Sequence, residues 1–130
     1  MKNMKKFIAI FILCIIPCSF SARADDVPSE PDTIPKASAV VRIMNKAAGK
    51  AKTVTFPVGK TTEYERMSIL VRACRVSAPY SAADNFMFAE ISKKAGNASA
   101  PIFSGWMMAS DPGYNPLQDA DYDLWLIKCE

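Results

Sequence analysis

The sequence predicts an all-β fold: a small single-domain β-sandwich or barrel of about six antiparallel strands, with one short helix near residues 115–120 and one disulfide. Short runs rich in β-branched and aromatic residues recur along the chain, and turn-forming residues separate them. The two cysteines beyond residue 24 are Cys74 and Cys129, which lie in two different runs. A bond between them would therefore join distant strands.

The first 24 residues have the features of a secretory signal peptide. Residues 1–6 (MKNMKK) are basic, residues 7–16 are unbroken and apolar, and residues 21–24 (SARA) form an A-x-A cleavage site. The apolar run is too short to span a bilayer, which needs about 20 residues. We expect cleavage after Ala24 and export to the periplasm, leaving a mature protein that does not span the membrane; an uncleaved anchor is the alternative.

Cleavage would change the charge balance. It removes Lys2, Lys5, Lys6 and Arg23, so the basic residues fall from 16 to 12 while all 13 acidic residues remain. The net charge then moves from +3 to −1 (12 − 13). No basic stripe is left to follow a phosphate backbone, and we therefore exclude nucleic acid as a partner.

Cleavage would also remove Cys14 and Cys18 and leave Cys74 and Cys129. Two cysteines in an oxidising compartment are expected to pair. Their separation excludes a C-x-x-C redox motif, so we predict a structural disulfide, with a pair of free thiols as the alternative.

Residues 25–38 (DDVPSEPDTIPKAS) are rich in proline and acid, and they predict an extended, flexible leader. Residues 39–130 then form one β-domain. Within it, residues 39–45 and 52–58 flank a loop containing Gly49, which predicts a hairpin. The second run alternates threonine with apolar residues, and Pro57 makes it an edge strand or ends it.

Four further strands follow in order. Residues 67–76 are rich in β-formers, residues 85–93 end in the turn-rich segment KKAGNASA, and residues 102–109 and 122–130 complete the set. Between the last two strands, Asn115 as N-cap and Pro116 at the first helical position predict a helix to about Ala120.

Residues 103–116 (FSGWMMASDPGYNP) contain the candidate binding surface. Strand alternation places Ile102, Ser104, Trp106 and Met108 on one face and Phe103, Gly105, Met107 and Ala109 on the other. Both faces are apolar, as in a strand that is buried on both sides or that offers one face to a partner. Gly105 predicts a bulge or a close approach of another segment, and Asp111-Pro112-Gly113 predicts a turn.

The last strand helps to choose between the two tryptophans. Asp123, Trp125, Ile127 and Cys129 are expected to share a face, which would place Trp125 in the core beside the disulfide. Trp106 is then the better candidate for exposure. The predicted partner-binding residues are Trp106, Met108, Asp111 and Tyr114.

Catalytic and metal motifs are weak. The chain has no histidine, which excludes Ser–His–Asp and Cys–His arrangements and the commonest zinc ligand. Carboxylates such as Asp84, Glu90, Asp111 and Asp123 are the remaining acid–base candidates. Asp119, Asp121, Asp123 and Glu130 follow the spacing of a calcium loop, but Leu124 stands where the loop needs glycine. We therefore predict no catalytic residue, no metal and no cofactor.

Several motifs together resemble the DUF2155 family of exported bacterial envelope proteins, a domain of unknown function. They are NKAAGK (45–50), VGKTTEYERMSI (58–69), MFAEI (87–91), FSGWMMASDP (103–112) and YDLWLIKC (122–129). By position, the family's motif residues are Gly59, Cys74, Phe103, Gly105, Trp106, Met107, Pro112, Tyr122, Asp123, Trp125 and Cys129. The resemblance implies a periplasmic protein with paired cysteines and no assigned activity. The chain departs from the family in having only Pro79 after the first cysteine and Ala120-Asp121 where His-Pro is usual.

These observations favour a non-enzymatic periplasmic domain that binds an envelope partner, either a protein or a cell-wall component. The first alternative is a carboxylate-dependent hydrolase acting on envelope glycan, which needs two acids converging in a cleft. The second alternative is a small calcium-stabilised module.

Overall fold

The computed structural model describes residues 32–130, which form eight β-strands in two antiparallel sheets. The strands are β1 (Thr33–Pro35), β2 (Ser38–Asn45), β3 (Lys50–Pro57), β4 (Thr61–Tyr64), β5 (Met67–Ser77), β6 (Asn85–Ala95), β7 (Ala98–Met108) and β8 (Tyr122–Cys129). The predicted signal peptide and residues 25–31 of the predicted leader lie outside the described residues. Within residues 32–130 no helix is long and apolar enough to cross a membrane.

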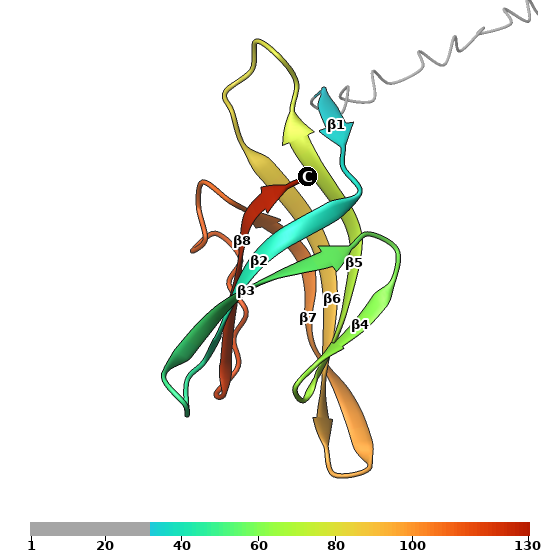
Figure 1. Ribbon diagram of the computed structural model, residues 1–130, viewed down its shortest axis with the longest axis vertical. Helices are drawn as coiled ribbons and strands as arrows, with labels where there is room; N and C mark the ends of the chain where they lie inside the picture. The colour runs from blue at the N-terminus through green and yellow to red at the C-terminus, as the bar shows by residue number, and fades with distance from the viewer. Residues whose placement is uncertain (1–31) are drawn as a thin grey trace, which may run out of the picture.

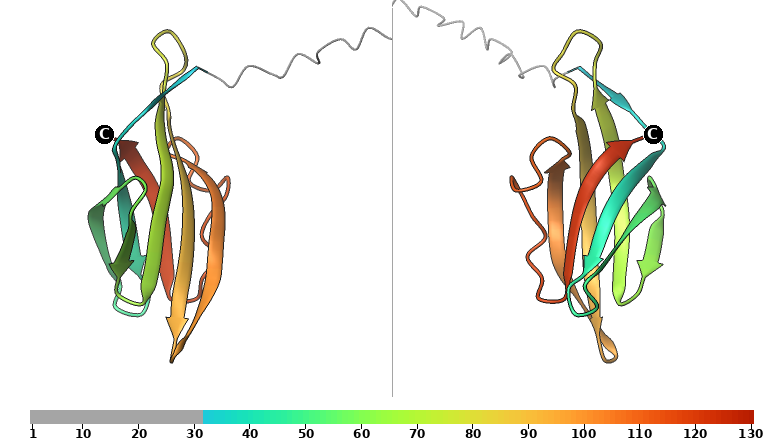
Figure 2. Two further views of the ribbon diagram at one scale, coloured as in Figure 1. Left: turned by 90° about the vertical axis from the view of Figure 1, so that its right-hand side faces the viewer. Right: turned by 60° about the vertical axis from the view of Figure 1, so that its left-hand side comes forward.

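The larger sheet has the order β1-β5-β6-β7. β4 and β1 both pair with the edge of β5 that faces away from β6, β4 at the start of β5 and β1 at its end. The smaller sheet has the order β3-β2-β8. The two sheets stack face to face (Figures 1 and 2), so the all-β prediction is confirmed and the architecture is a sandwich.

The six predicted strands are all present, with ends that differ by a few residues. β2 and β3 form the predicted hairpin, and β3 ends at Pro57 on an edge of its sheet. The two shortest strands, β1 and β4, were not predicted from the sequence. Residues 33–35, which we assigned to the leader, pair with β5, and β2 already begins at Ser38.

The core lies between the sheets and follows the alternation of each strand. Its largest fully buried side chains come from β2, β3, β5, β6 and β8. They are Val41, Ile43, Phe56, Met67, Ile69, Val71, Cys74, Met87, Ile91 and Leu126. Because both sheets contribute, neither sheet can bury its inner face without the other.

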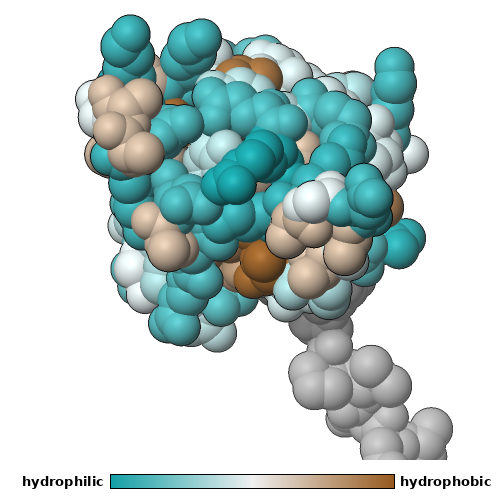
Figure 3. Space-filling view, turned by 90° about the horizontal axis from the view of Figure 1, so that it is seen from below, coloured by the Kyte–Doolittle hydropathy of each residue, from teal (hydrophilic) through white to brown (hydrophobic). Residues whose placement is uncertain are grey.

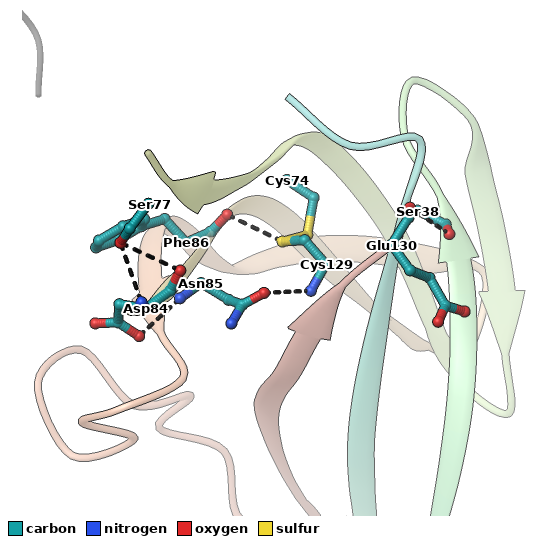
Figure 4. Close-up of a disulfide and its surroundings, with 8 residues drawn as sticks. All are labelled: Ser38, Cys74, Ser77, Asp84, Asn85, Phe86, Cys129 and Glu130. Atoms are coloured by element: carbon teal, nitrogen blue, oxygen red, sulfur yellow. Dashed lines mark hydrogen bonds between the residues drawn. A yellow bond between two sulfur atoms is a disulfide. The ribbon is translucent and has the colours of Figure 1, made fainter. Parts of the chain in front are cut away.

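The disulfide joins the two layers at one end of the sandwich. Cys74 of β5 is bonded to Cys129 of β8, with 5.6 Å between the Cα atoms. The backbone N–H of Cys129 also donates to the side-chain oxygen of Asn85 on β6 at 2.8 Å (Figure 4). Ser38 and Glu130 exchange backbone hydrogen bonds of 2.8 and 2.9 Å nearby. The predicted cystine is thus confirmed, and it lies in a hydrogen-bonded corner.

The connection between β7 and β8 must run the length of the sandwich. Met108 at the end of β7 pairs with Phe86, and Cys129 at the end of β8 bonds to Asn85, so both strands end beside the start of β6. Residues 109–121 therefore return along one open side of the sandwich (Figure 2).

The helix predicted at 115–120 is wrong, because residues 109–121 form only turns and irregular structure. A helix advances about 1.5 Å per residue and an extended chain about 3.3 Å, so the return path favours the extended form. The Asn115 amide, our expected N-cap, instead donates to the Trp106 carbonyl at 3.0 Å. Leu117 enters the core, where it is 4% exposed.

A cluster of charges fixes the far end of this connection. The Lys93 ammonium donates to both Asp119 carboxylate oxygens at 3.0 and 2.9 Å and lies 2.6 Å from the Asp121 carboxylate. The Asp119 carboxylate also accepts hydrogen bonds from the backbone N–H groups of Asp121 and Tyr122 at 2.9 and 3.1 Å.

Figure 3 shows the end of the sandwich where the β2–β3, β4–β5 and β6–β7 turns lie together, and the surface of this end is largely hydrophilic.

These contacts shift the pKa values of the cluster in the direction that keeps it charged. Burial raises the pKa of Asp119, but the Lys93 hydrogen bond and the two backbone N–H groups outweigh it, and the net pKa is lowered. The hydrogen bonds that Lys93 donates to Asp121 and Asp119 raise the pKa of Lys93. The cluster is therefore a salt-bridged clamp between β6 and the start of β8.

The disulfide should carry a large share of the stability. Replacing Cys74 and Cys129 together by alanine opens a loop of 55 residues, and the chain-entropy model gives a loss of about 4 kcal/mol for a loop of this length. Urea unfolding should show this loss as a lower midpoint. A double variant as stable as the parent would contradict the structural role.

Stability at acid pH should depend on Asp119. Because its pKa in the folded protein lies below the ordinary value of 3.8, its contribution is present above about pH 4 and is lost as the pH falls through the folded pKa. Asp119→Asn should lower Tm at neutral pH and flatten the acid limb of the Tm profile. The control is Asp111→Asn, since the Asp111 carboxylate makes no hydrogen bond among residues 32–130. Equal acid limbs in Asp119→Asn and the parent would contradict this role.

Candidate functional site

An apolar surface lies on the outside of the larger sheet, across β6 and β7. Phe86 pairs with Met108, and Phe88 pairs with Trp106 in the next row on the same face. Trp106 is 41% exposed, and its ring meets that of Phe88 edge to face at a centroid distance of 5.4 Å and an interplanar angle of 76°. We call these four residues the outer aromatic face. None of them belongs to the core between the sheets.

The predicted division of β7 between two faces is confirmed from Phe103 to Met108, but Ile102, which we placed on the Trp106 face, is the extra residue of a bulge and packs against the core. Met107 is buried and Phe103 packs against the core, whereas Trp106 is exposed on the opposite face. The structure thus brings the predicted residues Trp106 and Met108 onto one surface.

Two members of the outer aromatic face, Phe86 and Phe88, were not predicted as site residues. The signal was present in the sequence. Residues 86–89 alternate phenylalanine with buried Met87 and Ala89, so both faces of β6 are apolar, as they are in β7. Two neighbouring strands that are apolar on both faces indicate an apolar outer surface as well as a core.

Gly105 marks a close approach and not a bulge. Gly105 pairs normally with Ala89. The register of the β6–β7 pair shifts between Pro101 and Phe103, so Ile102 is the extra residue. A Cβ atom at Gly105 would lie 2.6 Å from the side-chain nitrogen of Asn115. Glycine therefore lets Asn115 reach the Trp106 carbonyl, which holds the connection against β7.

The other two predicted residues, Asp111 and Tyr114, lie in this connection. The backbone N–H of Tyr114 donates to the Asp111 carbonyl at 3.1 Å, which confirms the predicted turn. Tyr114 is 67% exposed, and its neighbour Asn115 is bonded to β7. Asp111 and Tyr114 are thus in the segment beside β7 and are not members of the outer aromatic face.

The placement of Trp125 in the core is wrong. Trp125 lies on the outside of the smaller sheet, half-buried and opposite Arg42. The register of the β2–β8 pair shifts after Leu126, so Ile127 is an extra residue and is exposed. A bulge moves the alternation by one residue, and Leu126 and Cys129 consequently share the inner face.

The structure does not bring the candidate catalytic carboxylates into one cleft. Glu90 pairs with Arg72 at 2.9 Å on the outside of the larger sheet, and Asp123 pairs with Lys46 at 3.0 Å on the outside of the smaller one. These two outer faces point in opposite directions. A glycosidase needs two acids on either side of one bond, which this arrangement does not supply.

Asp84 has a structural role at the start of β6. Its carboxylate accepts the backbone N–H of Asn85 at 2.7 Å and both the N–H and the hydroxyl of Ser110, at 3.0 and 2.5 Å. Burial raises the pKa of Asp84, but the hydrogen bonds from Ser110 and Asn85 outweigh it and the net pKa is lowered. A general acid near neutral pH needs the opposite shift.

The aspartates with calcium-loop spacing bind cations of the protein itself. Asp119 and Asp121 bind Lys93, and Asp123 binds Lys46. Glu130 pairs with Lys128 at the other end of β8. Residues 32–130 contain no group of three or more acidic or cysteine side chains placed to hold a metal ion.

Comparison with known proteins places the chain in a family. A search of curated proteins and a search of solved structures each gave no match. The family model described as "Uncharacterized protein conserved in bacteria (DUF2155)" matches residues 39–129, from the start of the β2–β8 pairing to Cys129. Because this match spans well over half of the chain, the protein belongs to the DUF2155 family.

Proposed function

We propose that this protein is a non-enzymatic binding domain of the bacterial envelope, and that it docks a partner protein on the outer aromatic face. The observation that carries the proposal is the position of Trp106, which is 41% exposed beside the partly exposed Phe88 on the outside of the larger sheet. Contiguous exposed apolar patches rimmed by polar residues mark interaction sites.

The composition of the surface favours a protein partner. Tryptophan, phenylalanine and methionine are enriched in the buried centres of protein interfaces, and tryptophan is prominent among hot spots. The Arg72–Glu90 ion pair, at 2.9 Å, lies on the same face of the sheet and can serve as a polar rim. The face is built on regular strands, so it presents a preformed surface that loses little conformational entropy on binding.

The proposed compartment is the periplasm, reached through a signal peptide that is cleaved after Ala24. The basic, apolar and small-residue segments of residues 1–24 support this proposal. The buried cystine is also compatible with an oxidising compartment. The outer aromatic face would then meet periplasmic proteins or envelope components, and not cytoplasmic ones.

Truncating the outer aromatic face should abolish binding without unfolding the domain. Trp106→Ala removes the exposed anchor, and loss of a hot-spot tryptophan weakens an interface by about 2 kcal/mol or more, or roughly thirtyfold in Kd. The measurement is capture of envelope proteins by the purified domain, followed by titration of the captured protein. Tyr114→Ala should reduce capture less, because Tyr114 lies in the adjoining connection.

Tyr80→Ala is the matched control, since Tyr80 is a fully exposed aromatic in the β5–β6 loop. It should leave capture unchanged. Equal capture by the Trp106→Ala, Tyr114→Ala and parent proteins, with all three folded, would defeat the proposal. Binding of isolated cell wall in place of a protein, lost in Trp106→Ala, would assign the same face to the other class of partner.

The export proposal predicts the N-terminus of the mature protein. Mass spectrometry of the protein isolated from its native envelope should find a chain that begins at Asp25. A chain that retains residues 1–24 would support the uncleaved anchor instead.

A further inference from the structure

A small pocket lies on the side of the molecule away from the outer aromatic face, between residues 109–121 and β8. It is lined by Pro112, Pro116, Leu117, Asp123, Leu124 and Trp125, and its volume is about 160 Å³. Trp125 and Asp123 come from the outer face of the smaller sheet, and the two prolines are exposed on the connection. The pocket is therefore open to solvent, and five of its six lining residues are apolar.

The size of the pocket limits its ligand to one ring. Sites that enclose a drug-sized molecule have volumes of roughly 300–1,000 Å³. A cavity of about 150 Å³ is sufficient for benzene. The volume of about 160 Å³ thus fits a single six-membered ring, with the rest of any longer ligand outside.

The charges at the rim indicate a neutral ligand. The Lys46 ammonium lies 3.0 Å from one Asp123 carboxylate oxygen and donates to the Asp119 carbonyl at 2.7 Å. Because Asp123 already has a cation beside it, a cationic ligand would have to compete with Lys46, and an anionic ligand would meet Asp123. A neutral ligand avoids both costs.

The same ion pair retains hydrogen-bonding capacity. An ammonium has three donors and a carboxylate accepts at both oxygens, so Lys46 has one N–H left and Asp123 has its second oxygen. Their side chains are 38% and 42% exposed. Asp123 lines the pocket, and the Lys46 ammonium lies beside it. A donor–acceptor pair of this kind suits the adjacent hydroxyls of a sugar, each of which can donate and accept.

We propose that this pocket binds one neutral pyranose ring of a glycan. The apolar C–H face of the ring would stack on the Trp125 indole, whose electron-rich face attracts polarised C–H groups. The Asp123–Lys46 pair would bind the ring hydroxyls. A proline ring has similar size, but it has no hydroxyl and could use neither the remaining N–H of Lys46 nor the second carboxylate oxygen of Asp123. The proposal does not rest on the docking of a protein at the outer aromatic face.

Tryptophan fluorescence can test the pocket alone. The chain has two tryptophans, so Trp106→Phe makes Trp125 the only one and also leaves the outer aromatic face aromatic. Titration of this variant with a β-1,4-linked trimer of N-acetylglucosamine should give a saturable change in emission. Adding Asp123→Ala should weaken binding by about tenfold, as expected for the loss of a charge-assisted hydrogen bond.

The matched control is Glu63→Ala, which breaks another exposed ion pair, that of Glu63 with Lys94. It should leave sugar binding unchanged. Absence of a saturable change at millimolar trimer, or equal binding with and without Asp123→Ala, would overturn the proposal. An equal, saturable response to hexaproline that also survives Asp123→Ala would overturn it as well, and would assign the pocket to proline rings.

Discussion

The structure depends on the path that the chain must take between β7 and β8. These strands lie in different sheets, yet both end beside the start of β6. The connection must therefore return along the whole open side of the sandwich. It is held at three levels: Asn115 against β7, Leu117 in the core and Asp119 on Lys93. These three contacts attach the connection to β7, to the core and to β6 along its length.

The two candidate surfaces both border this connection. On one side, Gly105 gives Asn115 room to bond the Trp106 carbonyl, while the Trp106 ring turns outward to meet Phe88. On the other side, the two prolines of the connection meet Trp125 across a small pocket. The disulfide at one end and the charged clamp at the other keep the sheets that carry these surfaces in register.

The strands and the face on which most of their side chains lie could be predicted from local patterns, because the alternation of side chains is a property of a single strand. It placed Met107 inside and Trp106 outside correctly. It failed at Trp125, because a bulge at Ile127 is set by pairing with β2 and leaves no local signal. The expected helix failed for a similar reason: Asn115 and Pro116 are good helix starters, but the distance to be covered requires an extended chain. The pocket needs Trp125 on the outer face and an extended connection beside it. Because neither feature could be predicted, the pocket could not be predicted either.

The central claim is that the outer aromatic face binds a protein in the envelope. Site-specific photocrosslinking tests it most directly: a photoreactive phenylalanine analogue replaces Phe88 in the native host, and a second strain carries it at Tyr80, an exposed aromatic outside that face. The account predicts one discrete crosslinked protein from position 88, absent from position 80 and lost when Trp106→Ala is added. Identical products from both positions, or none from position 88, would contradict it.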